Sequence, residues 1–213
     1  MSETPSIDRG VLEAARAPLA LGPDVIEALL PHRRPFLMID RVVAYARAPQ
    51  PSLWTSRHVS SNESVFDGHF PGLHLWPGVY TIEGMGQSCN VLAVLGALER
   101  VAMASGGEPD DLLPLLRNLE LGARLDPGFR PDARQRFGAL DEGADPALRR
   151  GLAAAVDVKL VAPVFAGERI DFFVTRVKTF GALARFAVEA SVDGRVVAKG
   201  AITGAHGAPS AAP

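Results

Sequence analysis

The stretch that follows Pro77 limits the possible fold more than any other, because it reads as one long helix with apolar side chains on nearly every face. Apolar residues recur at helical spacing from Val79 to Leu92, and they spread to the other faces in the run 91–98. That run is far shorter than the roughly 20 residues that cross a membrane, and Glu99-Arg100 ends it. We therefore expect a helix buried inside the fold.

Segments of strand character lie on both sides of this helix. Residues 36–46 and 53–59 are strand-like, with a proline-containing turn between them, and they indicate a hairpin. Four more strands are expected after it, at residues 152–161, 169–177, 184–192 and 195–203. The Asp193-Gly194 pair is a strong signal of a type I′ hairpin turn. Periodicity thus predicts an α+β chain with one long buried helix and antiparallel strands.

Length and composition favour a single globular domain. The chain has 213 residues, and 47% of them are apolar, which suits one core of ordinary size. We expect a flexible N-terminal segment at 1–22, the domain at 23–205 and a flexible tail at 206–213. A short helix is expected from Asp24 to Leu30. Residues of about 104–150 form an insertion, predicted to be a partly helical lid or a partner surface.

Charge and cysteine content bear on partners and compartment. A formal charge of -2 provides no electrostatic basis for binding nucleic acid or an anionic membrane. The N-terminal residues lack the basic and apolar regions of a secretory signal, and Cys89 alone cannot form an internal disulfide. These features predict a cytoplasmic protein in which Cys89 is a small core residue.

A candidate base and a candidate acid stand 14 residues apart, at His69 and Glu83. His69 lies in a loop constrained by Gly68 and Pro71, and a fixed imidazole can accept a proton near neutral pH. Glu83 interrupts the apolar helix pattern, where a carboxyl group must be paired or stay protonated. A protonated carboxyl can donate to a leaving group.

Simpler roles exist for each of these residues. A loop histidine is more often a structural residue than a catalyst, and Glu83 alone is equally compatible with an ion pair to an arginine. The remaining histidines are interpreted as structural: His32, His58, His74 and His206.

The surrounding residues resemble the β-hydroxyacyl-acyl-carrier-protein dehydratases of bacterial fatty-acid synthesis, the FabZ-type hotdog proteins. The family pattern G-H-F-P-x5-P-G-V-x3-E-x3-Q is matched at all nine specified positions, namely Gly68, His69, Phe70, Pro71, Pro77, Gly78, Val79, Glu83 and Gln87. Segments 29–42 and 159–168 also resemble family segments, so the resemblance covers about residues 23–103 and 151–205.

The resemblance implies a hotdog fold, in which an antiparallel sheet wraps around a long central helix, here with an inserted segment. It also implies dehydration of a 3-hydroxyacyl thioester to the trans-2-enoyl thioester. His69 would remove the C2 proton and Glu83 would protonate the C3 hydroxyl. In the family the two residues of one site come from different protomers, which implies a homodimer or a higher oligomer. Glu rather than Asp at position 83 points to the FabZ-like branch over its isomerising relatives.

Pro77-Gly78 marks the helix start, where unpaired N–H groups and the helix dipole favour an oxyanion. The Gly78 N–H is therefore the candidate donor to the thioester carbonyl, and Gln87, Pro71 and Pro77 are supporting residues. No metal or redox cofactor is expected, because the phosphopantetheine arm belongs to the substrate, carried by acyl carrier protein or coenzyme A. Arg33, Arg34 and Lys159 are candidates to meet an acidic carrier, although solvated charges are the commoner role.

Two departures from the family pattern and two rival functions complete the predictions. His74 stands where the family commonly has proline, and Gly84 and Gly86 stand where it has alanine. We expect these changes either to widen the tunnel for a bulky or unusual acyl chain or to loosen the site of a protein that has become a scaffold. The rival functions are a hotdog acyl thioesterase and a non-catalytic hotdog subunit of a heteromeric dehydratase.

Overall fold

The computed structural model describes residues 7–125 and 151–205. The expected C-terminal tail and the second half of the expected insertion lie outside these residues. No helix in the described ranges is long and apolar enough to cross a membrane.

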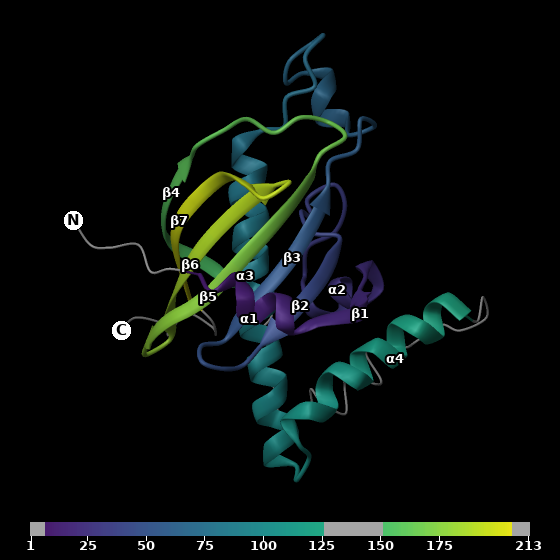
Figure 1. Ribbon diagram of the computed structural model, residues 1–213, viewed down its shortest axis with the longest axis vertical. Coiled ribbons are helices and arrows are strands. Elements are labelled where there is room, and N and C mark those ends of the chain that lie inside the picture. Colours follow the sequence, from purple (N-terminus) through teal and green to yellow (C-terminus); the bar gives the residue numbers. More distant parts are fainter. Residues whose placement is uncertain (1–6, 126–150, 206–213) are drawn as a thin grey trace, which may run out of the picture.

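Within the described ranges, seven strands form one antiparallel sheet in the order β1-β2-β3-β5-β6-β7-β4 (Figure 1). The strands are β1 Arg16–Leu21, β2 Arg41–Ala46, β3 Ser52–His58, β4 Leu152–Leu160, β5 Arg169–Phe180, β6 Leu183–Val192 and β7 Arg195–Ala205. In the β6–β7 turn the φ angles of Asp193 and Gly194 are 48° and 80°, as the type I′ prediction requires. The first predicted strand is shorter than expected, because residues 36–40 form a loop against the central helix instead of pairing in the sheet.

Helix α3 (Gly78–Ala104) lies along one face of this sheet, as the continuous apolar pattern predicts (Figure 1). It shares one core cluster with side chains from β5 and β6, including Phe172, Val174, Phe186 and Val188, each no more than 1% exposed. These side chains are two residues apart within each strand, so they project to the same face. The predicted α+β hotdog architecture is confirmed.

Gly84 is a point of close contact between α3 and β5. A Cβ atom added there would lie 2.5 Å from Cζ of Phe172, so glycine is needed for packing at this position. Gly86 faces open space, with nothing within 4 Å of an added Cβ. Of the two glycines expected to widen the tunnel, only Gly86 leaves room for a ligand.

Residues 9–21 of the N-terminal segment form a helix and a strand that the sequence does not predict. Helix α1 (Arg9–Ala14) is capped by the Asp8 side chain, and β1 pairs with β2 at the edge of the sheet. Leu12 is fully buried in a second cluster on the outer face of the sheet, where Trp54 and Phe173 also pack. Contacts with distant strands hold this segment in place, and local periodicity does not reveal such contacts.

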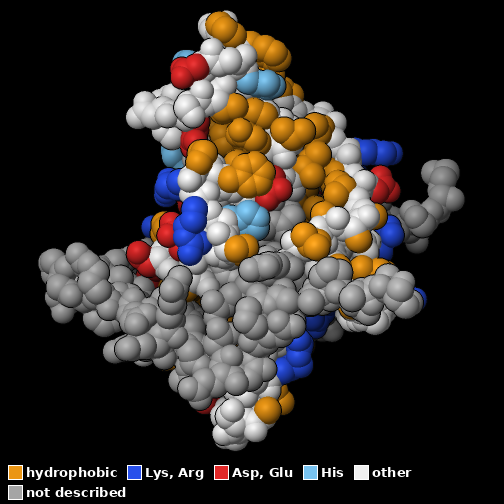
Figure 2. Space-filling view, turned by 180° about the vertical axis from the view of Figure 1, so that it is seen from behind, with side chains coloured by type: hydrophobic (Ala, Val, Ile, Leu, Met, Phe, Trp, Pro, Cys, Tyr) orange, Lys and Arg blue, Asp and Glu red, His pale blue; other side chains and the backbone are white. Residues whose placement is uncertain are grey.

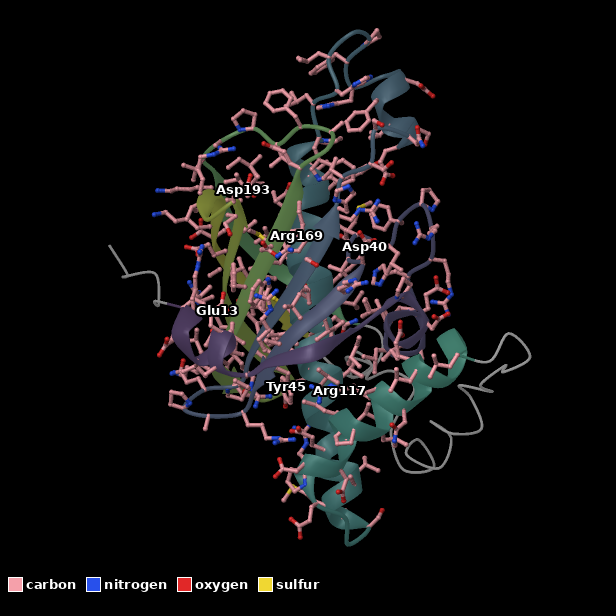
Figure 3. All side chains as sticks on the ribbon, turned by 45° about the vertical axis from the view of Figure 1, so that its right-hand side comes forward. Glu13, Asp40, Tyr45, Arg117, Arg169 and Asp193 are labelled. Atoms are coloured by element: carbon pink, nitrogen blue, oxygen red, sulfur yellow. The ribbon has the colours of Figure 1, made fainter. Side chains whose placement is uncertain are left out.

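The first half of the insertion forms helix α4 (Leu112–Leu125) after a 3₁₀ turn η2 (Pro109–Asp111). It packs against β1 and against the short helix α2 (Pro23–Leu29). At its base, the Tyr45 hydroxyl and Arg47 Nε both donate to the buried carboxylate of Glu99, at 2.8 and 2.6 Å. Burial and the adjacent Glu99 raise the pKa of Tyr45. Figure 3 labels Tyr45 at the end of the sheet near α4, and Arg117 on α4 itself.

Candidate active site

The His69 imidazole is fixed by its own loop, which follows the 3₁₀ turn η1 (Ser64–Asp67). Its Nδ1 lies 2.9 Å from the carbonyl oxygen of Leu75. A carbonyl only accepts hydrogen bonds, so the ring hydrogen is on Nδ1 and the Nε2 lone pair is left to accept a proton. The ring also stacks on Phe70, with the two centroids 4.3 Å apart. This arrangement suits a general base held in one orientation.

The loop is in turn docked on the segment that precedes β5. Trp76 N–H donates to the Val164 carbonyl at 2.8 Å, and Leu75 forms an isolated β-bridge with Phe165. Pro71 and Gly72, which has a φ of 81°, form the tip, where the backbone groups of Phe70 and Leu73 bond to each other. Both segments lie at the same end of the molecule (Figure 1).

His69 and Gly78 line the same cavity, of about 360 Å³, which we call the His69 cavity. Pro77 is the N-cap of α3 and Gly78 its first residue, so the Gly78 N–H has no acceptor within the helix. A Cβ atom on Gly78 would overlap the side chain of Leu160 at the end of β4. Glycine therefore lets β4 approach the helix N-terminus and close one side of this cavity.

Glu83 lies one and a half turns further along α3 and lines a different cavity, of about 250 Å³, which we call the Glu83 cavity. Gln87 Nε2 donates to Glu83 Oε1 at 2.9 Å. The same Nε2 donates to the Phe36 carbonyl at 2.7 Å, and Gln87 Oε1 accepts from Met38 N–H at 2.8 Å. Gln87 is thus fixed by the 36–38 loop, and it holds one oxygen of the Glu83 carboxyl group.

His32, interpreted from the sequence as structural, is a second neighbour of Glu83. Its Nε2 lies 3.6 Å from Glu83 Oε1, and it lines the Glu83 cavity. The sequence placed His32 in a family-like segment but offered no spacing that links it to Glu83. The two residues meet only because the chain after α2 folds back over α3.

Arg57 is the other residue that sequence reasoning did not identify. Its buried guanidinium donates to Asp40 Oδ1 at 3.0 Å and pairs with Glu63, next to η1. It also lies over the Trp76 ring, with Cζ 5.7 Å from the centroid. One cation therefore connects the loop that fixes Gln87 with the loop that carries His69.

The structure brings His69 and Gly78 together and places Glu83 elsewhere: within one chain, the base and the acid line separate cavities. Figure 2 shows many apolar side chains gathered on the upper part of the face seen there, with histidine and acidic side chains among them. The exposed apolar residues of the chain include Phe36, Val79, Leu152, Val156 and Leu160.

In residues 7–125 and 151–205, no group of three or more His, Cys, Asp or Glu side chains is placed to hold a metal ion. Cys89 lines the Glu83 cavity, and burial raises the pKa of its thiol. The thiol is therefore held in its neutral form.

Comparisons with known proteins agree with this geometry. A family model described as a FabA-like domain matches residues 30–108. A 3-hydroxyacyl-[acyl-carrier-protein] dehydratase FabZ from Anaeromyxobacter sp. (strain Fw109-5) is 32% identical over 187 residues, which are 88% of this chain and 90% of that protein. A protein of the same name from Neisseria meningitidis serogroup C / serotype 2a is 49% identical over 70 residues, which are 33% of this chain and 46% of that one.

Among solved structures, the dehydratase heterocomplex ApeI:P from Xenorhabdus doucetiae aligns with a TM-score of 0.52 at 17% identity, over 85% of this chain and 90% of that one. This similarity shows a shared fold. The 32% identity over nearly the whole of both chains shows the family. The chain belongs to the family of the 3-hydroxyacyl-[acyl-carrier-protein] dehydratases FabZ.

Proposed function

We propose that this protein dehydrates a 3-hydroxyacyl thioester on acyl carrier protein to the trans-2-enoyl thioester in fatty-acid synthesis. The observation that carries the proposal is the fixed tautomer of His69, which leaves Nε2 as a base in the cavity that Gly78 lines. Family membership supports the same reaction.

The reaction needs a base, an acid and a donor to the carbonyl. His69 Nε2 takes the C2 proton, and negative charge develops on the thioester oxygen, which accepts a hydrogen bond from the Gly78 N–H at the helix N-terminus. Glu83 protonates the C3 hydroxyl, the C3–O bond breaks and water leaves. Water leaves with the proton of Glu83 while the C2 proton is held on His69, and a proton passes from His69 back to Glu83 before the next turnover. No atom is oxidised or reduced, so the reaction as written needs no metal or redox cofactor.

A complete site requires two chains, because His69 and Glu83 line separate cavities within one. We place the contact between protomers at β4. No described strand pairs with its outer edge, and Leu152, Val156 and Leu160 are each about half exposed. At the opposite edge, α4 packs on β1. An unpaired apolar edge strand is suited to pairing with a second copy.

The surface for the carrier protein is part of the same proposal. A third cavity, of about 360 Å³, lies between α3 and the β5–β6 hairpin, and Arg100 and Arg176 line it. The Nη1 atoms of Arg100 and Arg176 lie within 4 Å of the position that a Cβ atom on Gly96 would occupy. Neither arginine has a carboxylate partner among the described residues. Phe186 separates this cavity from the Glu83 cavity. Two cations without a carboxylate partner in the described ranges, in a cavity next to the Glu83 cavity, suit an acidic carrier and its phosphate. Arg33 instead donates to the carbonyls of Leu30 and His32.

The decisive experiment is intact-mass spectrometry of a carrier protein loaded with 3-hydroxyacyl chains. The unmodified protein should remove one water, and the His69→Ala and Glu83→Gln variants should not. Release of the whole acyl group would indicate a thioesterase. An unchanged mass across several chain lengths would indicate a non-catalytic subunit.

Mixing the two inactive variants tests the shared site. After subunit exchange, half of the dimers would be mixed, and each would hold one intact site, so about a quarter of the activity should return. Absence of recovery, with exchange verified by native mass spectrometry, would contradict a site built from two chains.

Cytoplasmic location remains part of the proposal and follows from the reducing environment that a lone Cys89 indicates.

A further inference from the structure

The two oxygens of the Glu83 carboxyl group have different surroundings. Oε1 accepts from Gln87 Nε2 at 2.9 Å and lies 3.6 Å from His32 Nε2. No described group donates to Oε2. We propose that His32 is a positioning residue that, together with Gln87, occupies Oε1, so that the acidic proton resides on Oε2 and faces the substrate. This inference rests on the proposed dehydratase function.

The ring of His32 identifies which nitrogen carries its hydrogen. His32 Nδ1 is buried and has no hydrogen-bond partner among the residues that the structure describes. A hydrogen there would leave a buried donor unpaired, which costs more than an unpaired acceptor. The hydrogen is therefore on Nε2, the atom that points toward Glu83 Oε1.

The loop after α2 carries His32, and its residues 36–38 fix Gln87 of α3. Arg33 Nη1 donates to the carbonyls of Leu30 and His32, at 2.9 and 2.8 Å, and fixes the backbone around His32. The His32 ring stacks on Phe36, at 6.4 Å between centroids and an interplanar angle of 27°. The carbonyl of Phe36 accepts from Gln87 Nε2. His32 and Gln87 are thus held in a fixed relation to each other.

The hydrogen bond from Gln87 at 2.9 Å and the polar contact with His32 Nε2 at 3.6 Å both act on Oε1, and together they decide the orientation of the protonated carboxyl group. A hydroxyl on Oε1 would direct its hydrogen against the N–H groups of Gln87 and His32. A hydroxyl on Oε2 meets no N–H group of the described residues. No other charged side chain lines the Glu83 cavity within the described residues. Without His32, only Gln87 acts on Oε1, so the carboxyl group rotates more readily and its proton spends less time toward the substrate. The loss should fall on kcat and leave KM nearly unchanged, because substrate binding is not affected.

Three substitutions separate this role from packing. Gln places its amide nitrogen where Nε2 lies, Asn reaches only as far as Nδ1, and Phe keeps the stacking on Phe36 without a donor. We expect His32→Gln to retain most activity, and His32→Asn and His32→Phe to lose about 2- to 10-fold in kcat, the size expected for one polar contact with a neutral carboxyl group. His58→Gln is the matched control, since His58 is exposed on β3 and should tolerate the change. Equal losses in all three His32 variants, or none, would overturn the proposal.

A measurement independent of catalysis completes the test. Long-range ¹⁵N–¹H correlation spectra of the full chain, with His32→Gln used for assignment, should show the Nε2–H tautomer of His32. A hydrogen on Nδ1 would overturn the positioning role whatever the activity. If the tautomer is as expected but the protein removes no water from any carrier-bound substrate, the dehydratase function fails while the arrangement around Oε1 stands.

Discussion

Two glycines on the same turn of α3 form a matched pair for testing how the helix meets the sheet. In Gly84→Ala the new methyl group would lie 2.5, 2.9 and 3.1 Å from three ring atoms of Phe172, which is 1% exposed. In Gly86→Ala nothing lies within 4 Å of the new methyl group. The two changes are chemically identical and differ only in what the methyl group meets.

The expected magnitudes follow from two opposing effects. Alanine improves helix propensity by about 1 kcal/mol at either position. Overpacking a well-filled core costs about 1–3 kcal/mol, and this cost applies only at Gly84. Gly86→Ala should therefore stabilise the protein by about 1 kcal/mol. Because the propensity gain cancels between the variants, Gly84→Ala should be about 1–3 kcal/mol less stable than Gly86→Ala.

Urea unfolding at one protein concentration measures this difference, with equal m values as the control for an unchanged unfolded state. Thermal unfolding should show the same order, with roughly 2–4 °C for each kcal/mol in a chain of this size. Equal stabilities would refute the close approach of α3 to Phe172. Adding Phe172→Leu to Gly84→Ala should restore part of the loss, since the two residues are in contact.

Three further predictions concern the interface, a buried charge and pH. Val156→Lys on β4 should convert dimers to monomers in sedimentation velocity and abolish dehydration, whereas a dimer that persists would move the interface elsewhere. Arg57→Met should cost about 3–5 kcal/mol in urea unfolding, because Asp40 and Glu63 lose a buried partner, whereas the more exposed Arg169→Met should cost below about 1 kcal/mol. Burial raises the pKa of the Cys89 thiol in the folded protein above its value of about 8.5 in the unfolded chain. The stability that the neutral thiol contributes is therefore fully present below about pH 8.5, and it is lost as the pH rises and the thiol of the unfolded chain ionises. Stability should therefore fall more steeply above about pH 9 than in Cys89→Ala, and parallel pH curves would contradict this.

Much of the site was predictable because its residues lie close together in sequence. His69, Gly78, Glu83 and Gln87 fall within one loop and the helix that follows it, so a fixed spacing carries their relation. His32 was not predictable, because it contacts Glu83 from a segment about fifty residues away. The effect of Gly84 was predicted incorrectly, since only the position of Phe172 shows that its missing side chain makes room for a strand.

The sequence by itself determined the buried central helix, the antiparallel strands around it and the likeness to a family with a histidine and a glutamate at matching positions. Apolar periodicity and turn residues act over a few positions, so they are visible in the chain. The tertiary structure alone decided that residues 9–21 form a helix and an edge strand, that His69 and Glu83 line separate cavities, and that His32 and Gln87 approach the same carboxylate oxygen. These outcomes depend on which distant side chains pack together, and packing in three dimensions leaves no local period in a sequence.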